Sequence, residues 1–180
     1  MKEITKPAIV LLVITAIAAG LLGVIEDVTS GPIAAKAAAT QAAAMQEVFP
    51  EATTFEEVTD ATLTGTMSSV SIAKDASGAD AGYVVTVAPG GFGGAIKTMV
   101  GVTADGTVTG ISILSLAETP GLGALATEDS FKSQYVGKSG TLAVTKDGGE
   151  IVPITSATIT SRAVTDGVNE AVAWVVGGAK

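Results

Sequence analysis

The feature that most constrains this chain is an uncharged apolar run close to its N-terminus. Residues 7–25 read PAIVLLVITAIAAGLLGVI, which is 19 residues without a charged side chain. At about 1.5 Å of rise per residue, a helix of this length spans roughly 28 Å and matches the hydrocarbon core of a bilayer. The sequence therefore predicts a transmembrane helix at residues 7–25, preceded by a short segment at residues 1–6.

The charges on either side of this run predict its orientation. Two lysines precede it and two acidic residues follow it: Lys2, Lys6, Glu26 and Asp27. Because positive residues favour the cytoplasmic side, we expect a single-pass protein of the cell (inner) membrane with a cytoplasmic N-terminus and an extracytoplasmic remainder. The alternative is a cleaved signal peptide, since Ala16-Ile17-Ala18 resembles a cleavage site. The apolar run continues past that site, which favours a retained anchor.

The composition limits the chemistry that the side chains can perform. The 180 residues include no histidine and no cysteine, and the formal net charge is -8. These absences exclude disulfides, thiolate metal sites, cysteine-ligated iron–sulfur clusters and triads built on histidine. No acidic cluster has the spacing of a calcium loop, so no metal site is expected, and an acidic chain is a poor ligand for nucleic acid. Little chemistry is therefore expected from the chain's own side chains, and a borrowed cofactor is the economical source of any activity.

A second helix is expected between the anchor and the main domain. Ser30-Gly31-Pro32 predicts a break, and Pro32 suits the first turn of a new helix. Residues 33–49 are rich in alanine and predict an amphipathic helix, which Pro50 ends. We therefore assign residues 26–50 to a connecting helix and residues 51–180 to the main domain.

From about residue 64 the pattern indicates strands. Runs rich in Val, Ile and Thr occur at residues 69–73, 83–88, 96–103, 107–115 and 141–145. Asp105-Gly106 predicts a hairpin, and helices are expected at residues 125–136 and at about 160–176. Antiparallel strands with segregated helices predict an α+β fold.

Three motifs are candidates for a binding site. The first, Gly90 to Gly94, is not followed by the Lys-Ser/Thr pair of a phosphate loop, which favours a mobile turn between strands. The second, residues 118–123, reads ETPGLG and predicts a type II turn whose glycines let a flat ligand approach the backbone. Whether the first motif contacts the same ligand stays open.

The third motif, residues 155–161, precedes the terminal helix and reads TSATITS, with five hydroxyls in seven residues. Capping explains one or two of them, and Thr160 or Ser161 is the expected N-cap. The N-terminus of a helix carries free N–H groups and a partial positive charge. The motif therefore suits a phosphate, and a hydroxyl there could be esterified by one.

Together these motifs resemble the FMN-binding domain family, which includes the G subunit of the Rnf complex and the C subunit of sodium-pumping NADH:quinone reductase. The ETPGLG loop is similar to the family's signature loop, residues 131–138 to its short helix ending in Gly-Lys, and residues 91–97 to its glycine-rich strand entry. Residues 155–158 resemble its flavinylation motif, Asp-x-x-Ser/Thr-Gly-Ala-Thr. This chain has Val152 at the Asp position, Ser156 at the Gly position, and Leu116 where the family often has His.

The resemblance implies a covalent phosphothreonyl-FMN at Thr158, formed by a flavin transferase outside the membrane. It implies that FMN is bound by residues of the second and third motifs: Glu118, Thr119, Pro120, Gly121, Leu122, Thr155, Ser156, Ala157, Thr158, Ile159 and Thr160. The single anchor and short chain favour the Rnf-type G subunit among the family's members. The chain itself is not expected to carry a catalytic residue, because the flavin supplies the redox chemistry.

The function that follows is an electron carrier in a membrane-bound ferredoxin–NAD oxidoreductase complex. That complex would couple electron transfer to translocation of Na⁺ or H⁺, and its other membrane subunits would be the partners. One alternative is an anchored flavoprotein of another extracytoplasmic electron-transfer chain. A second is a pilin-like structural protein, which the absence of a glutamate in residues 7–25 disfavours.

Overall fold

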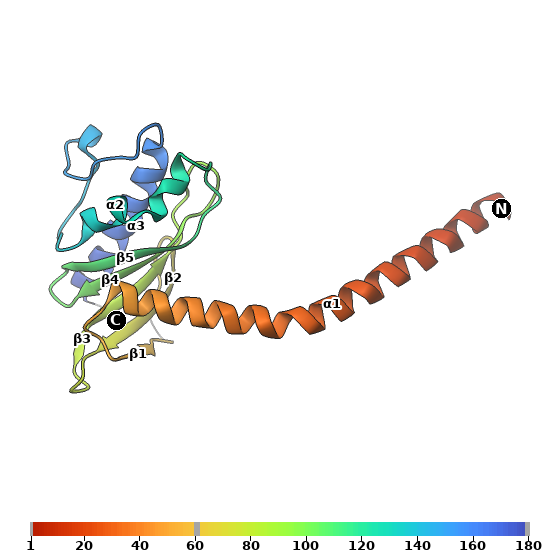
Figure 1. The fold of residues 1–180 in the computed structure, drawn as a ribbon, viewed down its shortest axis with the longest axis horizontal. Coiled ribbons are helices and arrows are strands. Elements are labelled where there is room, and N and C mark those ends of the chain that lie inside the picture. The colour runs from red at the N-terminus through yellow and green to blue at the C-terminus, as the bar shows by residue number, and fades with distance from the viewer. Residues whose placement is uncertain (1, 60–61, 179–180) are drawn as a thin grey trace. The chain divides into compact units, whose positions relative to one another are not determined.

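Two compact units make up the chain, Met1–Thr40 and Gln41–Lys180. The computed structural model describes residues 2–59 and 62–178 (Figure 1). The first unit is part of one long helix, whereas the second contains a sheet with helices. The predicted α+β class with an apolar N-terminal helix is confirmed.

Helix α1 (Lys2–Val48) is the longest element of the chain. Apolar side chains between Ile9 and Val28 are exposed, and α1 is the one helix among the described residues that is long and apolar enough to cross a membrane. The break expected at Ser30-Gly31-Pro32 is wrong, because α1 continues through Pro32. A proline removes one hydrogen bond from a helix, but the alanine-rich sequence that follows has a strong helix propensity. The boundaries of the membrane-spanning part stay predictions.

The second unit is built on a five-stranded antiparallel sheet whose strands lie side by side in chain order (Figure 1). The strands are β1 (Thr54–Glu57), β2 (Met67–Lys74), β3 (Asp80–Val87), β4 (Lys97–Thr103) and β5 (Val108–Ser115). The predicted β4–β5 hairpin is confirmed. Gly106 has a φ of +88° and its N–H donates to the Thr103 carbonyl over 2.9 Å.

The segment between the sheet and the last helix differs most from expectation. The predicted helix at 125–136 is three short pieces, η1 (Gly123–Thr127), α2 (Asp129–Lys132) and η2 (Ser133–Tyr135). Glu128, the N-cap of α2, has an extended backbone, which separates η1 from α2. The predicted strand at 141–145 contains a single bridge, Val144 to Ile151, followed by η3 (Thr145–Asp147). Strand β1 is an element that the sequence pattern did not predict.

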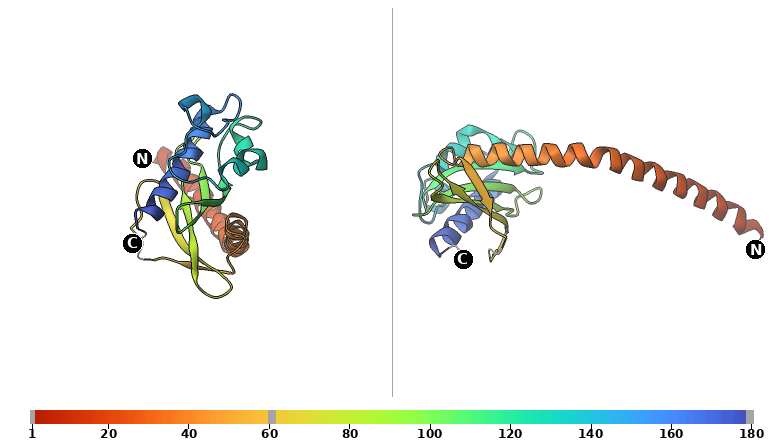
Figure 2. Two further views of the ribbon diagram at one scale, coloured as in Figure 1. Left: turned by 90° about the vertical axis from the view of Figure 1, so that its left-hand side faces the viewer. Right: turned by 90° about the horizontal axis from the view of Figure 1, so that it is seen from below.

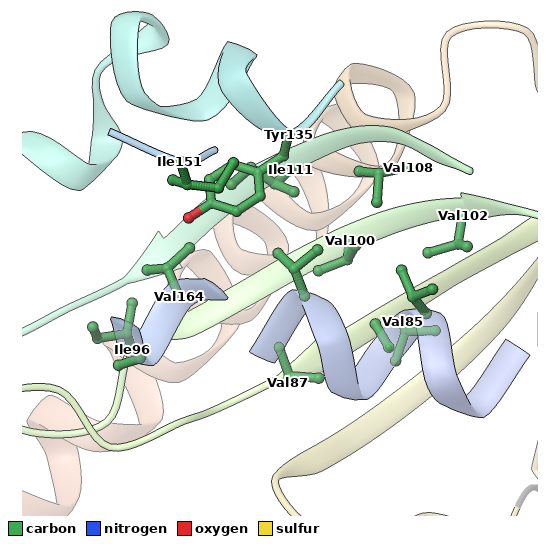
Figure 3. Close-up of a cluster of buried hydrophobic side chains, with 14 of the residues drawn as sticks. Val85, Val87, Ile96, Val100, Val102, Val108, Ile111, Tyr135, Ile151 and Val164 are labelled. Atoms are coloured by element: carbon green, nitrogen blue, oxygen red, sulfur yellow. The ribbon is translucent and has the colours of Figure 1, made fainter. Parts of the chain in front are cut away.

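Helix α3 (Thr158–Val176) and the loops after β5 enclose the main core on one face of the sheet (Figure 3). The core residues labelled there are Val85, Val87, Ile96, Val100, Val102, Val108, Ile111, Tyr135, Ile151 and Val164. The Tyr135 hydroxyl lies 2.8 Å from Thr165 Oγ1, so its polar end is satisfied. Burial raises the pKa of Tyr135 well above its ordinary value, which keeps the hydroxyl protonated.

The last turns of α1 pack on the opposite face of the sheet (Figure 2). Neighbouring residues of a strand point to opposite faces, and accordingly Val84 belongs to this second cluster whereas Val85 belongs to the main core. The cluster also contains Ala44, Val48 and Phe49 from the end of α1 and the residue after it. The C-terminal end of α1 is therefore an integral part of the second unit.

Two paired glycines let α1 approach the sheet closely. Gly101 of β4 lies opposite Gly110 of β5. A Cβ atom on Gly101 would lie 2.3 Å from the Val48 carbonyl oxygen, and one on Gly110 would lie 2.9 Å from Val48 Cα. Thr109 Oγ1 donates to the same carbonyl, which is one of the acceptors left free at the end of the helix.

We expect Gly101→Ala to destabilise the protein by about 1–3 kcal/mol, because the backbone at Val48 must move to admit a methyl group. The free energy of unfolding of the full chain in detergent, measured by urea denaturation, checks this. Gly90→Ala is the control, since a Cβ atom there would meet nothing within 4 Å. Equal stability of the two variants would show that α1 does not pack against Gly101.

Candidate functional site

A buried carboxylate connects the three motifs. Glu118 lies three residues after β5 and is 7% exposed. One carboxylate oxygen, Oε1, accepts a hydrogen bond from the Gly93 N–H over 3.0 Å. The other, Oε2, accepts one from the Thr160 hydroxyl over 2.8 Å. Glu118 thereby ties the glycine-rich turn to the beginning of α3.

The glycines around Glu118 leave room for its side chain. A Cβ atom on Gly91 would lie 2.3 Å from Oε1, and one on Gly123 would lie 2.5 Å from Oε2. A Cβ atom on Gly93 would lie 2.0 Å from the Ala117 carbonyl oxygen. The glycine-rich turn does connect two strands as predicted. The glycines of this turn allow its backbone to pack closely against the Glu118 side chain and the neighbouring backbone.

The loop after Glu118 contains the turn that the sequence predicts. The Leu122 N–H donates to the Thr119 carbonyl over 3.1 Å, and Gly121 has a φ of +75°. This is the bond and the conformation of a type II turn with Pro120 and Gly121 at its centre. The turn brings Leu122 and Gly123 back beside Glu118.

Helix α3 begins at Thr158, two residues earlier than expected, and Ala157 is its N-cap. The prediction that Thr160 or Ser161 caps the helix is wrong. Thr160 donates to Glu118, while Ser161 Oγ accepts from the Ile154 N–H and donates to the Ala157 carbonyl, each over 3.0 Å. No side chain caps α3 in the described part of the chain, which leaves the first N–H groups of the helix available.

Ser156, just before the helix, has an unusual backbone conformation. Its φ is +62°, and it is the one non-glycine residue with positive φ among the described residues. A side chain in this left-handed region costs roughly 1–2 kcal/mol, which glycine avoids. The flavinylation motif that this segment resembles has glycine at this position. The left-handed conformation of Ser156 explains that preference for glycine.

These segments surround a cavity of about 340 Å³, a size typical of small-ligand sites. Its lining combines apolar and hydroxyl side chains: Phe92, Glu118, Thr119, Leu122, Gly123, Ser156, Ala157, Thr158, Ile159 and Thr160. Eight of the eleven residues predicted to bind the cofactor are in this lining. Pro120 and Gly121 are not, and Thr155 lines a neighbouring depression with Leu125 and Val152. Phe92, which is 72% exposed, brings the glycine-rich turn into the site.

A lysine that the sequence did not single out lies beside Thr158. Lys146 Nζ donates to the Thr158 hydroxyl over 2.8 Å. Arg162, one helical turn after Thr158, contacts both carboxylate oxygens of Asp147 at 2.6 Å, and it lowers the pKa of that carboxyl below its ordinary value. Nothing in the sequence links Lys146 to the third motif, because the intervening chain folds back irregularly through η3.

The cavity fits the cofactor that the motif resemblance implies. Phe92, Leu122 and Ile159 are exposed apolar side chains at its lining, suited to a flat aromatic ring. The Thr158 hydroxyl is half-buried, beside an ammonium group and at a helix N-terminus, which suits a phosphate.

Comparison with known proteins gives two family matches, an RnfG N-terminal region at residues 1–48 and an FMN-binding domain at residues 91–173. The chain is 37% identical over 179 residues to the G subunit of the ion-translocating oxidoreductase complex of Methanosarcina acetivorans, covering 97% of this chain and 95% of the relative. It is 37% identical over 186 residues to the G subunit of the Na(+)-translocating ferredoxin:NAD(+) oxidoreductase complex of Acetobacterium woodii, covering 93% and 89%.

Among solved structures, the chain is similar to the C subunit of the Na(+)-translocating NADH-quinone reductase from Parabacteroides distasonis. The two are 25% identical, with a TM-score of 0.48 over 60% of this chain and 61% of that one. The sequence matches to G subunits extend from the N-terminal helix through the cavity-forming segments. The chain therefore belongs to the family of G subunits of Rnf-type ion-translocating oxidoreductase complexes.

Proposed function

We propose that this chain is a covalently flavinylated electron carrier, with FMN attached through a phosphodiester to Thr158 Oγ1. It acts as the G subunit of a membrane complex that couples electron transfer from ferredoxin to NAD with translocation of Na⁺ or H⁺. The FMN-binding domain match and the relatives of the same family support this role. When bound, the flavin supplies the one-electron chemistry that the side chains of this chain lack.

The observation that carries the proposal is the position of Thr158. Its hydroxyl lines the cavity at the first residue of α3, where the free N–H groups and the dipole of the helix stabilise a phosphate. The apolar side chains of Phe92, Leu122 and Ile159 bind the ring of the flavin and exclude water from it. Glu118 fixes the positions of the segments that carry Phe92 and Thr158, because it accepts hydrogen bonds from both segments.

The attachment site and the N-terminus lie on opposite sides of the membrane in this proposal. The lysines before the apolar run favour a cytoplasmic N-terminus, so the FMN domain is extracytoplasmic. A separate flavin transferase on that side performs the attachment. A covalent bond keeps the flavin in place where free FMN is scarce.

We expect Thr158→Ala to abolish attachment while preserving the fold, because Thr158 Oγ1 is the esterified atom and its hydroxyl is hydrogen-bonded to an exposed side chain, Lys146. After co-expression with a flavin transferase, intact-mass analysis of wild type shows the added mass of FMN less one water, and the variant shows none. Fluorescence of denatured protein in a gel gives the same answer. Thr141→Ala, which removes an exposed hydroxyl that lines a different pocket, is the matched control and keeps the flavin. Wild type without added mass would refute covalent attachment.

The absence of cysteine allows a clean test of orientation. We expect Ala104→Cys, in the exposed β4–β5 turn, to react with a membrane-impermeant maleimide in intact spheroplasts. Thr5→Cys, before the apolar run, reacts only after the membrane is permeabilised. The opposite labelling pattern would reverse the proposed orientation.

The left-handed conformation of Ser156 predicts that glycine is better at this position. We expect Ser156→Gly to stabilise the protein by about 0.5–1 kcal/mol, since relief of strain exceeds the entropy that glycine loses on folding. Ser130→Gly, in α2 with ordinary negative φ, is the control and destabilises by about as much. Urea denaturation of the full chain in detergent measures both. A destabilised Ser156→Gly variant would contradict strain at this residue.

A further inference from the structure

We propose that Lys146 is the cationic residue that binds the flavin phosphate at Thr158, an inference that rests on the proposed function. Its ammonium group donates to the very hydroxyl that would be esterified, over 2.8 Å. A phosphodiester at Thr158 places anionic oxygens next to this atom, within reach of the same donor. A hydrogen bond between charged partners is about twice as strong as a neutral one. The ligand class is therefore a phosphate ester.

The turn that carries Lys146 is held against α3 by its neighbour. Asp147 forms a two-pronged ion pair with Arg162, with both N···O distances at 2.6 Å. Arg162 follows Thr158 by four residues, so both side chains lie on the same face of α3. The ion pair also neutralises Asp147, which would otherwise repel a phosphate beside Lys146.

The cavity is consequently polarised across the first turn of α3. Residues two apart on a helix do not share a face, and the hydroxyls of Thr158 and Thr160 accordingly have partners of opposite charge. Thr158 accepts from Lys146, whereas Thr160 donates to Glu118. A bound flavin is thus oriented, with its phosphate at the Lys146 end and its ring toward Glu118 and Phe92.

In the attachment step, Lys146 stabilises the negative charge of the phosphoryl group that is transferred to Thr158. Thr158 Oγ1 attacks the phosphorus of the FMN half of a flavin pyrophosphate donor, and the new O–P bond forms as the bond to the bridging oxygen breaks. A nucleoside monophosphate leaves, the hydroxyl proton passes to a base of the transferase, and no electrons change hands. Lys146 donates to Oγ1 without taking up the hydroxyl proton, and it then neutralises the phosphoryl oxygens.

The test compares rates of attachment among charge variants of the full chain in detergent. Lys146→Met, Lys146→Arg and wild type are incubated with a flavin transferase and a flavin dinucleotide, and the added mass is followed over time. Lys138→Met is the matched control, because Lys138 pairs with Glu150 and lines a different pocket. We expect Lys146→Met to react roughly ten- to a hundredfold more slowly, the range for one charge-assisted hydrogen bond, and Lys146→Arg to recover most of the rate.

Each outcome bears on one of the two proposals. Equal rates for Lys146→Met and wild type would overturn the role of Lys146 while leaving Thr158 as the attachment site. Wild type that gains no mass would overturn the proposed function and this inference with it. Thermal unfolding of each variant separates a loss of fold from a loss of rate. If Lys146→Met were to unfold, Lys146→Gln would replace it, because it removes the same positive charge beside the Thr158 hydroxyl and is expected to slow attachment also.

Discussion

The site depends on one buried carboxylate. Glu118 is almost fully buried, and burial of a charge is costly unless hydrogen bonds replace the lost water. Its two oxygens accept from Gly93 and Thr160, which come from segments far apart in the sequence. The close approach needs glycine at several neighbouring positions, because a single methyl group would collide with the carboxylate. The glycine-rich turn, the signature loop and the start of α3 therefore form one structural unit.

This arrangement explains how a short irregular segment can place a reactive hydroxyl accurately. Thr160 fixes the first turn of α3 to Glu118, and Ser161 fixes it to the backbone of Ile154. Thr158 is then the first residue of a helix whose direction is already set, with Lys146 on its other side. The hydroxyl-rich motif is thus not redundant. Two of its hydroxyls are structural, and one faces the ammonium group.

Regular elements and local turns were predictable from the sequence, whereas the irregular connections were not. Four strands, the Asp105-Gly106 hairpin and the turn at Pro120-Gly121 follow from β-propensity and from glycine's access to positive φ. The break at Pro32 and the helix at 125–136 were wrong. The alanine-rich continuation outweighs one proline, and the extended backbone at Glu128 interrupts an otherwise helical pattern.

The residues of the cavity likewise divide into those that the sequence predicts and those that it does not. Most residues of the second and third motifs line the cavity. The sequence could single them out because each motif is contiguous and resembles a known signature. Phe92 reaches the cavity and Lys146 reaches the Thr158 hydroxyl through tertiary folding, and no spacing rule connects either one to residue 158. The role of Glu118 as a shared acceptor likewise depends on the tertiary fold. A sequence shows that a carboxylate is present, but only the fold shows which donors it meets.

The lack of histidine and cysteine has a structural counterpart in this cavity. The polar side chains that define it are a carboxylate used for packing, three threonines, a serine and a neighbouring lysine, none of which is a redox group. These side chains can bind and orient a cofactor and neutralise its phosphate, but they cannot accept or release single electrons. The fold consequently provides a rigid, polarised holder, in which Glu118 maintains the shape and Lys146 supplies the charge. A cofactor fixed by one covalent bond to Thr158 would make these residues sufficient, because position is then the only property that the protein must control.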